Sequence, residues 1–181
     1  GKDPYDRFRG RLMLPIHDTR GRVIAFGGRI LDSDANPNAP KYLNSPDTPL
    51  FDKGRTLYNL HRAAPAARQS GRMIVVEGYM DAIALANAGI DEAVAPLGTA
   101  LTENQLNLLW RVTQEPVLCF DGDKAGVRAA WRSLDLALAG LKPALDGHIR
   151  SLARAGSHLN EADGRVVTDD VNPGLSLAID H

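Results

Sequence analysis

Short apolar runs that stop at a carboxylate and a glycine recur along this chain. The runs at 73–76 and 117–120 end in Glu77-Gly78 and Asp121-Gly122-Asp123, and each gives way to a segment with helical periodicity. Four or five β-formers in a row, bounded by glycine, are typical of a buried strand. Another short run, at 92–95, leads into Leu97-Gly98-Thr99. Strands that alternate with helices predict an α/β fold with a mostly parallel sheet flanked by helices.

The segments between these runs carry helix signals. An Ala-rich helix is expected from Leu60 to Ser70, ended by Gly71, and a second from Tyr79 to Ala88. Thr102 and Gln105 form a capping box that predicts a helix from 102 to 112. We expect the second helix to present one shared face, formed by Met80, Ile83, Ala84 and Asn87. We expect a long helix after Asp123 to present the stripe Val127, Ala130, Trp131, Leu134, Leu138 and Leu141.

The first seventy residues show a different pattern. Two β-rich runs at 11–16 and 22–26 flank a turn signal at 18–21, which predicts a β-hairpin. Gly27 and Gly28 follow, where the backbone can bulge or approach another segment closely. We interpret 40–46 as a loop whose Lys, Tyr, Asn and Ser suit contact with nucleic acid, with a merely solvated loop as the alternative.

Charge is divided unevenly along the chain. Of 181 residues, 24% are charged and the net charge is −1, yet residues 1–72 carry about +6 and the rest about −7. A basic part beside an acidic part suits a polyanion held by one and a metal ion held by the other, although uneven surface charge alone would look the same. The lone Cys119 lies in an apolar run and fits a small core residue in a reducing cytoplasm. No run is long enough to span a membrane, and no signal peptide is visible.

The carboxylates after the apolar runs indicate a metal site. Residues just past the carboxyl ends of parallel strands meet at one edge of a sheet, so Glu77 should lie near Asp121 and Asp123. Clustered carboxylates repel one another, and Mg²⁺ takes oxygen ligands and holds phosphates. Asp81 has a second explanation in the dipole of its own helix, and Asp123 has one as an N-cap. Asp121 has neither, and a carboxylate that ends a buried strand needs neutralisation.

These motifs together resemble a known family. Strand–Glu-Gly, strand–Gly-Thr and strand–Asp-x-Asp–helix are similar to the TOPRIM domain of bacterial primases, topoisomerases and certain nucleases. The flanking motifs resemble those of bacterial DnaG primases over about residues 3–145, and they are Tyr5-Asp6-Arg7-Phe8-Arg9, 21–29, Pro40–Pro46, Val76–Asp81 and Phe120–Gly126.

The resemblance implies an RNA polymerase domain that makes short RNA primers on single-stranded DNA from nucleoside triphosphates. It implies Glu77, Asp121 and Asp123 as catalytic residues, the same three with Asp81 as ligands of Mg²⁺, and Mn²⁺ as a substitute. Zinc and the replicative helicase would bind modules outside this chain. The nucleic-acid or nucleotide contacts it implies are Arg7, Arg9, Arg29, Lys41, Tyr42, Asn44, Lys53 and Arg55. Whether Glu77 is a ligand or a general base stays open.

We expect three regions: a smaller basic α+β subdomain at 1–71, a TOPRIM domain at 72–145, and a divergent, poorly ordered tail at 146–181. We interpret the chain as a fragment of a longer protein. DnaG primases continue with a strand that ends in an acidic Asp-Gly-x-Asp-Pro-Asp motif, which neither Asp146-Gly147-His148 nor Asp169-Asp170 matches. The only strand expected there is Arg165–Thr168, and an altered reading frame would explain the loss of pattern.

Two other functions remain open at this point. A truncated remnant would bind single-stranded DNA or nucleotide without synthesis, and the missing acidic motif favours it. A TOPRIM topoisomerase or nuclease is the third possibility, and a topoisomerase would need a nucleophilic Tyr on a separate domain.

Overall fold

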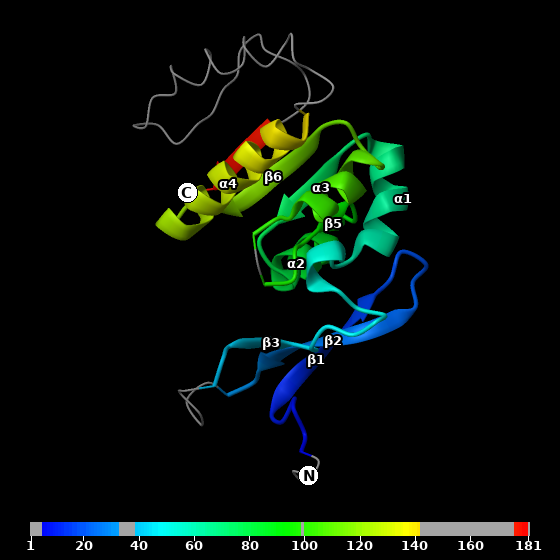
Figure 1. The fold of residues 1–181 in the computed structure, drawn as a ribbon, viewed down its shortest axis with the longest axis vertical. Helices are drawn as coiled ribbons and strands as arrows, with labels where there is room; N and C mark the ends of the chain where they lie inside the picture. Colours follow the sequence, from blue (N-terminus) through cyan, green and yellow to red (C-terminus); the bar gives the residue numbers. More distant parts are fainter. Residues whose placement is uncertain (1–4, 33–38, 99, 142–175, 181) are drawn as a thin grey trace.

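The described residues form two sheets that lie in separate halves of the molecule (Figure 1). The computed structural model describes residues 5–32, 39–98, 100–141 and 176–180. The smaller sheet has the antiparallel order β1-β2-β3, and the larger has the parallel order β5-β4-β6-β7. The elements are β1 (Arg11–His17), β2 (Val23–Ile30), β3 (Tyr42–Asn44), η1 (Lys53–Arg55), α1 (Leu60–Ser70), β4 (Met73–Val76), α2 (Tyr79–Asn87), β5 (Ala93–Val94), α3 (Glu103–Trp110), β6 (Pro116–Asp121), α4 (Lys124–Leu141) and β7 (Ser176–Asp180).

Helices cover both faces of the larger sheet. Every residue of β4 is buried, and its side chains alternate between the two faces. Met73 and Val75 pack in one cluster with α1, α3 and α4, whereas Ile74 and Val76 pack in another with α2. The half-buried Cys119 packs against this second cluster, which fits its interpretation as a small core residue. The α/β fold predicted from the runs and helix signals is therefore confirmed. Among the described helices, none combines the length and the apolar character needed to cross a bilayer.

The smaller sheet holds one strand that the pattern did not predict. The hairpin of β1 and β2 is confirmed, and Gly27 and Gly28 lie within β2. The segment interpreted as a loop at 40–46 contains β3, which pairs with β2 in the register Arg29↔Tyr42 and Gly27↔Asn44. The loop prediction was wrong because β3 is only three residues long and gains its order from β2.

Two predicted helix faces are confirmed only in part, since Ala130 is buried and Met80 and Ile83 are half-buried against the core. α4 buries Ala130, Ser133 and Ala137 and leaves Trp131 38% exposed. Small side chains let the helix backbone lie close to the sheet, so the larger residues of the predicted stripe are pushed to its margins. In α2 the buried residues are Tyr79 and Ala82, whereas Ala84 is exposed.

The tail contributes one described strand. β7 pairs in parallel with β6, and its register places Asp180 beside Asp121. The candidate strand at Arg165–Thr168, the pair Asp169-Asp170 and the stretch Asp146-Gly147-His148 lie outside the described residues. The sequence reasoning missed β7, although an apolar run at 175–179 follows the turn signal Asn172-Pro173-Gly174 and stops at an aspartate.

A candidate active site at the acidic edge of the larger sheet

Two of the predicted carboxylates lie where neighbouring strands end. Glu77 directly follows β4, and Asp121 is the last residue of β6, which pairs with β4. The backbone N–H of Asp121 donates a hydrogen bond of 3.2 Å to Oε1 of Glu77. The meeting of these two residues, predicted from strand ends, is confirmed. Asp121 is exposed, however, so the expected cost of burying its carboxylate is absent.

Gly126 in the first turn of α4 fixes how closely this edge is packed. A Cβ at this position would lie 2.1 Å from the carbonyl oxygen of Asp121 and 2.5 Å from Oε1 of Glu77. Such distances are far inside van der Waals contact, so only glycine fits here without movement of the backbone. The glycine lets the start of α4 close against the ends of β4 and β6.

Asp81 and Asp123 each hold the first turn of a helix. Asp123 Oδ1 accepts hydrogen bonds of 2.8 Å from the N–H groups of Ala125 and Gly126. Asp81 Oδ2 accepts one of 3.0 Å from the N–H of Gly78. Both alternative roles foreseen for these residues are therefore realised. In each case the second carboxylate oxygen takes part in no hydrogen bond among the described residues, so a cap does not prevent a further contact.

Glu77, Asp81, Asp121 and Asp123 form what we call the acidic edge, and the pKa of Glu77 is raised there. Partial burial is the largest cause, and the charges of Asp121, Asp123 and Asp81 act in the same direction, against the hydrogen bond from the Asp121 N–H. The pKa of Asp123 moves the other way, because the N–H groups of Gly126 and Ala125 stabilise its ionised form. Glu77 is therefore the member of the group for which a nearby cation would relieve the most unfavourable environment.

These residues fit a hard divalent cation by their chemistry. Four carboxylates gather at one edge, and carboxylate oxygens are the ligands that Mg²⁺ prefers. No three His, Cys, Asp or Glu side chains within the described ranges are placed to surround one ion. Mg²⁺ does not require such a set, because one or two carboxylates commonly hold it together with water and substrate phosphates.

A tight joint brings the smaller sheet to this edge. Tyr79 begins α2 two residues after Glu77 and is 5% exposed, and a Cβ on Gly27 would lie 3.1 Å from its ring. Asn44 of β3 donates a hydrogen bond of 3.1 Å from Nδ2 to the carbonyl of Leu97, in the loop that follows β5. Gly27 is thus the close approach foreseen for the glycine pair, and the joint lies beside the strand ends that carry the carboxylates.

The predicted nucleic-acid contacts fall into two groups. Arg29 and Tyr42 are paired across β2 and β3, and Lys41 lies next to Tyr42. Arg7 donates a hydrogen bond of 3.3 Å to the carbonyl of Asn44. The Lys41 Nζ lies 5.8 Å from the centre of the Tyr42 ring. Arg9 is exposed just before β1. Lys53 and Arg55 instead lie in η1, which contacts α3 of the other half.

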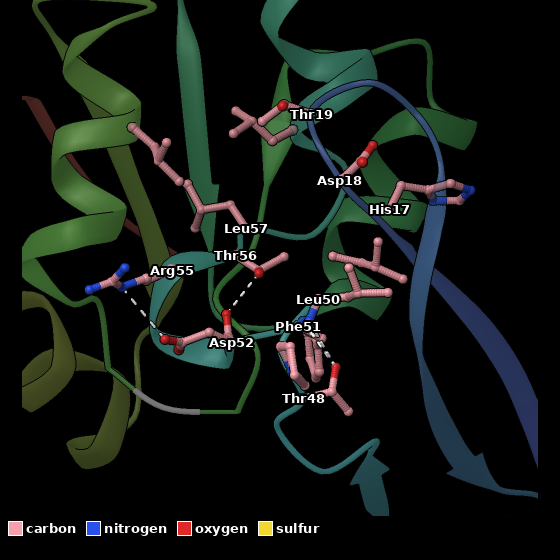
Figure 2. A pocket seen from close by; sticks show the side chains of 14 residues that line it. His17, Asp18, Thr19, Thr48, Leu50, Phe51, Asp52, Arg55, Thr56 and Leu57 are labelled. Carbon is pink, nitrogen blue, oxygen red and sulfur yellow. Dashed lines mark hydrogen bonds and ion pairs between the residues drawn. The ribbon is translucent and has the colours of Figure 1, made fainter.

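A pocket of about 410 Å³ lies on another surface, between the hairpin turn, the segment 48–57 and α3 (Figure 2). Phe51, Leu57 and Leu60 form part of its apolar wall, and Asp18 and Asp52 bring carboxylates to it. Figure 2 shows His17 and Arg55 toward opposite ends of this pocket. None of the carboxylates of the acidic edge lines it.

Comparison with known proteins decides the family. Residues 1–64 match the model of the N-terminal domain of the DNA primase catalytic core, and residues 71–145 match that of the Toprim domain. The DNA primases of Neisseria meningitidis (serogroup A) and Escherichia coli (strain K12) are each 55% identical, over 138 and 134 residues respectively. The chain belongs to the bacterial DnaG primase family. These alignments cover 76% and 74% of the chain but 23% and 22% of those proteins, so it spans about a quarter of the length of these primases.

Solved primase structures share its fold. The match to the Aquifex aeolicus primase structure (zinc-binding and RNA polymerase domains) has a TM-score of 0.71 and 46% sequence identity, and it covers 75% of this chain and 33% of the Aquifex chain. The match to the Escherichia coli primase catalytic core has a TM-score of 0.67 and 55% sequence identity, and it covers 74% of this chain and 42% of that structure. A DnaG catalytic domain bound to single-stranded DNA matches 74% and 41% at a TM-score of 0.66 and 54% identity. Toprim primases generally use a divalent metal ion.

Sequence reasoning missed some residues that position this site. The sequence places Tyr79 at a helix start within the motif Val76–Asp81 and gives no sign that it fills the joint between the two halves. Asn44 was singled out as a nucleic-acid contact, yet its amide is engaged by Leu97. The spacing of Gly27 and Tyr79 along the chain gives no sign that they meet, since some fifty residues separate them.

Proposed function

We propose that this chain carries the catalytic edge of a primase, which joins ribonucleotides into short RNA primers on a single-stranded DNA template. The observation that carries the proposal is the joint of Gly27, Asn44 and Tyr79. It places the smaller sheet, called the basic sheet here because it carries Arg29 and Lys41, beside the acidic edge. A polymerase needs both surfaces together, since one holds the template backbone and the other the triphosphate. Binding of a related DnaG domain to single-stranded DNA supports the same assignment.

Glu77, Asp81, Asp121 and Asp123 are the proposed ligands of Mg²⁺, for which Mn²⁺ would substitute. The ion would neutralise the triphosphate and favour ionisation of the attacking 3′-hydroxyl. Asp121 is exposed at the end of β6, so its oxygens are accessible from solvent. Glu77 has a raised pKa, which suits a group that accepts the proton of that hydroxyl and does not exclude a ligand role.

The basic sheet would hold the template. Arg29 and Lys41 are the proposed phosphate contacts, and the exposed ring of Tyr42 offers a stacking surface beside them. Arg7, Arg9, Asn44, Lys53 and Arg55 are proposed as further contacts because the resemblance to DnaG primases implies them. The replicative helicase is a proposed partner of the longer protein through a part outside this chain.

The first test is a Mn²⁺ and Mg²⁺ titration of the chain beside its Asp121→Asn, Asp123→Asn double variant. Asn retains the capping oxygen at 123, so the fold should survive and only ligand charge is lost. Asp135→Asn is the matched control, since Asp135 is exposed on the same helix about three turns away. We expect the double variant to bind Mn²⁺ at least about tenfold more weakly, as lost charge-assisted contacts require, and the control to bind like the parent.

Primer synthesis on single-stranded DNA with ribonucleoside triphosphates then separates two functions. Label incorporated into short RNA by the parent, and lost in the double variant, supports the polymerase. Metal and strand binding without synthesis would support the binding-only remnant instead. Equal Mn²⁺ affinity in parent and double variant would contradict the acidic edge as the metal site.

A further inference from the structure

The outward face of α3 carries a pocket that shares only Arg55 with the residues proposed to bind the metal ion or the template. Asn107 and Leu108 lie three and four residues after Asn104, and Arg111, the C-cap, lies four and three residues after them, so all four share one face of the helix. The opposite face, with Gln105, is buried. The pocket measures about 560 Å³ and is lined by Arg55, Asn104, Asn107, Leu108, Trp110 and Arg111.

Arg55 reaches this pocket from another part of the chain and is held there by α3. Gln105 Nε2 donates hydrogen bonds of 2.9 Å to the carbonyl of Lys53 and 2.8 Å to that of Thr56. Thr102 Oγ1 donates to the carbonyl of Gly54 between them. Three bonds, one from the N-cap of α3 and two from Gln105 on its buried side, thus hold the turn that carries Arg55. The backbone that positions both arginines is ordered before any ligand arrives, which lowers the entropy cost of binding.

The lining has the chemistry of a nucleotide site. Two guanidinium groups, on Arg55 and Arg111, suit phosphate oxygens, and no carboxylate lines the pocket. Trp110 is half-buried and supplies an indole on which a base can stack. The side-chain amides of Asn104 and Asn107 each offer both a donor and an acceptor to base edges or sugar hydroxyls. We propose that this pocket binds a phosphorylated nucleoside, either as a free nucleotide or as one unit of a single-stranded nucleic acid.

Neighbouring charge favours this position over the adjoining one. The pocket of Figure 2 shares Arg55 and Leu108 with this one, but Asp18 and Asp52 line it and would repel an anion. Asp52 also lies 3.6 Å from Arg55, with both side chains more than half exposed. An exposed pair of this length is weak, so phosphate can replace it. The pocket is separate from the carboxylates of the acidic edge and needs no metal ion.

Trp110 provides a local readout of binding. The chain has two tryptophans, so the Trp131→Phe background leaves Trp110 as the only indole reporter. In EDTA, which silences the acidic edge, we would titrate ATP and a short oligothymidylate separately and follow Trp110 fluorescence. The expected result is saturable quenching by at least one probe. Adding Arg55→Gln and Arg111→Gln together should weaken it about tenfold or more, because two charge-assisted contacts are lost.

Two controls isolate the pocket. Arg68→Gln removes an exposed arginine of α1 that lines neither pocket, and Arg29→Gln with Lys41→Gln removes charge from the basic sheet. Both should leave the Trp110 response unchanged. Quenching by ATP alone assigns a free nucleotide, and quenching by the oligonucleotide alone assigns a strand; either supports the pocket. No quenching by either probe, or an equal loss in the Arg68→Gln control, would overturn it, as would loss of the response in the basic-sheet variant.

Discussion

The acidic edge and the basic sheet solve the same problem, that of placing like charges together, in opposite ways. At the acidic edge the backbone positions the carboxylates: Glu77 accepts from the Asp121 N–H, and Asp123 accepts from the first turn of α4. In the basic sheet the Arg29 side chain makes no hydrogen bond or salt bridge with any described residue. Arg29 is placed only by the register of β2 and β3.

The difference teaches where each region is vulnerable. Packing at the acidic edge is so close that one added methyl group meets both Asp121 and Glu77. Lys41 is exposed, and the half-buried Arg29 side chain makes no hydrogen bond with a described residue, so removing either charge should leave the fold intact. Stability should therefore respond strongly to changes at the first region and hardly at all at the second.

Gly126→Ala should have the largest effect. The methyl group would clash with the Asp121 carbonyl at 2.1 Å and with Glu77 Oε1 at 2.5 Å. Overpacking costs about 1–3 kcal/mol, and a clash with a backbone oxygen belongs at the upper end of that range, above the roughly 1 kcal/mol that alanine gains over glycine in a helix. Urea denaturation should show the loss, and Mn²⁺ binding should weaken with it. Gly54→Ala is the control, because a Cβ there meets nothing closer than 3.4 Å; equal stability of the two variants would contradict the tight edge.

The residues that could be predicted from sequence are those governed by local rules. Strand ends at Glu77 and Asp121 followed from short apolar runs, and the capping box of Thr102 and Gln105 followed from spacing alone. The parallel pairing of β4 and β6 followed from their alternation with helices. The acidic edge could be predicted because its residues lie at strand ends that the sequence marks with a carboxylate followed by glycine.

Features that depend on distant partners were not predictable in this way. β3 is ordered by pairing with β2, and the buried face of α4 is chosen by the close fit of small residues against the sheet. The stripe of larger residues in α4 is a true helical signal, but it does not say which side meets the sheet. The joint of Gly27, Asn44 and Tyr79 combines three segments that are far apart in the chain.

Glu77→Gln should have a smaller effect, of opposite sign, in metal-free protein. Folding raises the pKa of this carboxyl, so the folded state binds its proton more tightly than the unfolded state does. Its contribution to stability therefore decreases as the pH rises from its ordinary pKa to the raised value. Above that range, Gln should melt slightly higher than Glu, and at pH 3 the two should converge. Thermal melts across pH in EDTA test this, and a lower melting temperature for Gln at pH 7 would contradict repulsion at this edge.

Arg29→Gln should change stability least of all. The half-buried side chain has no hydrogen bond or salt bridge to lose among the described residues, so the free energy of unfolding should change by no more than about 0.5 kcal/mol. Binding of single-stranded DNA should nevertheless weaken, with the slope of log K against log salt falling by about one unit, because one phosphate contact is removed. Fluorescence anisotropy at several salt concentrations measures this slope, and Arg68→Gln on α1 should leave it unchanged. A destabilised Arg29→Gln would show that the basic sheet, like the acidic edge, depends on its charged side chains for its fold, and the contrast between the two regions would disappear.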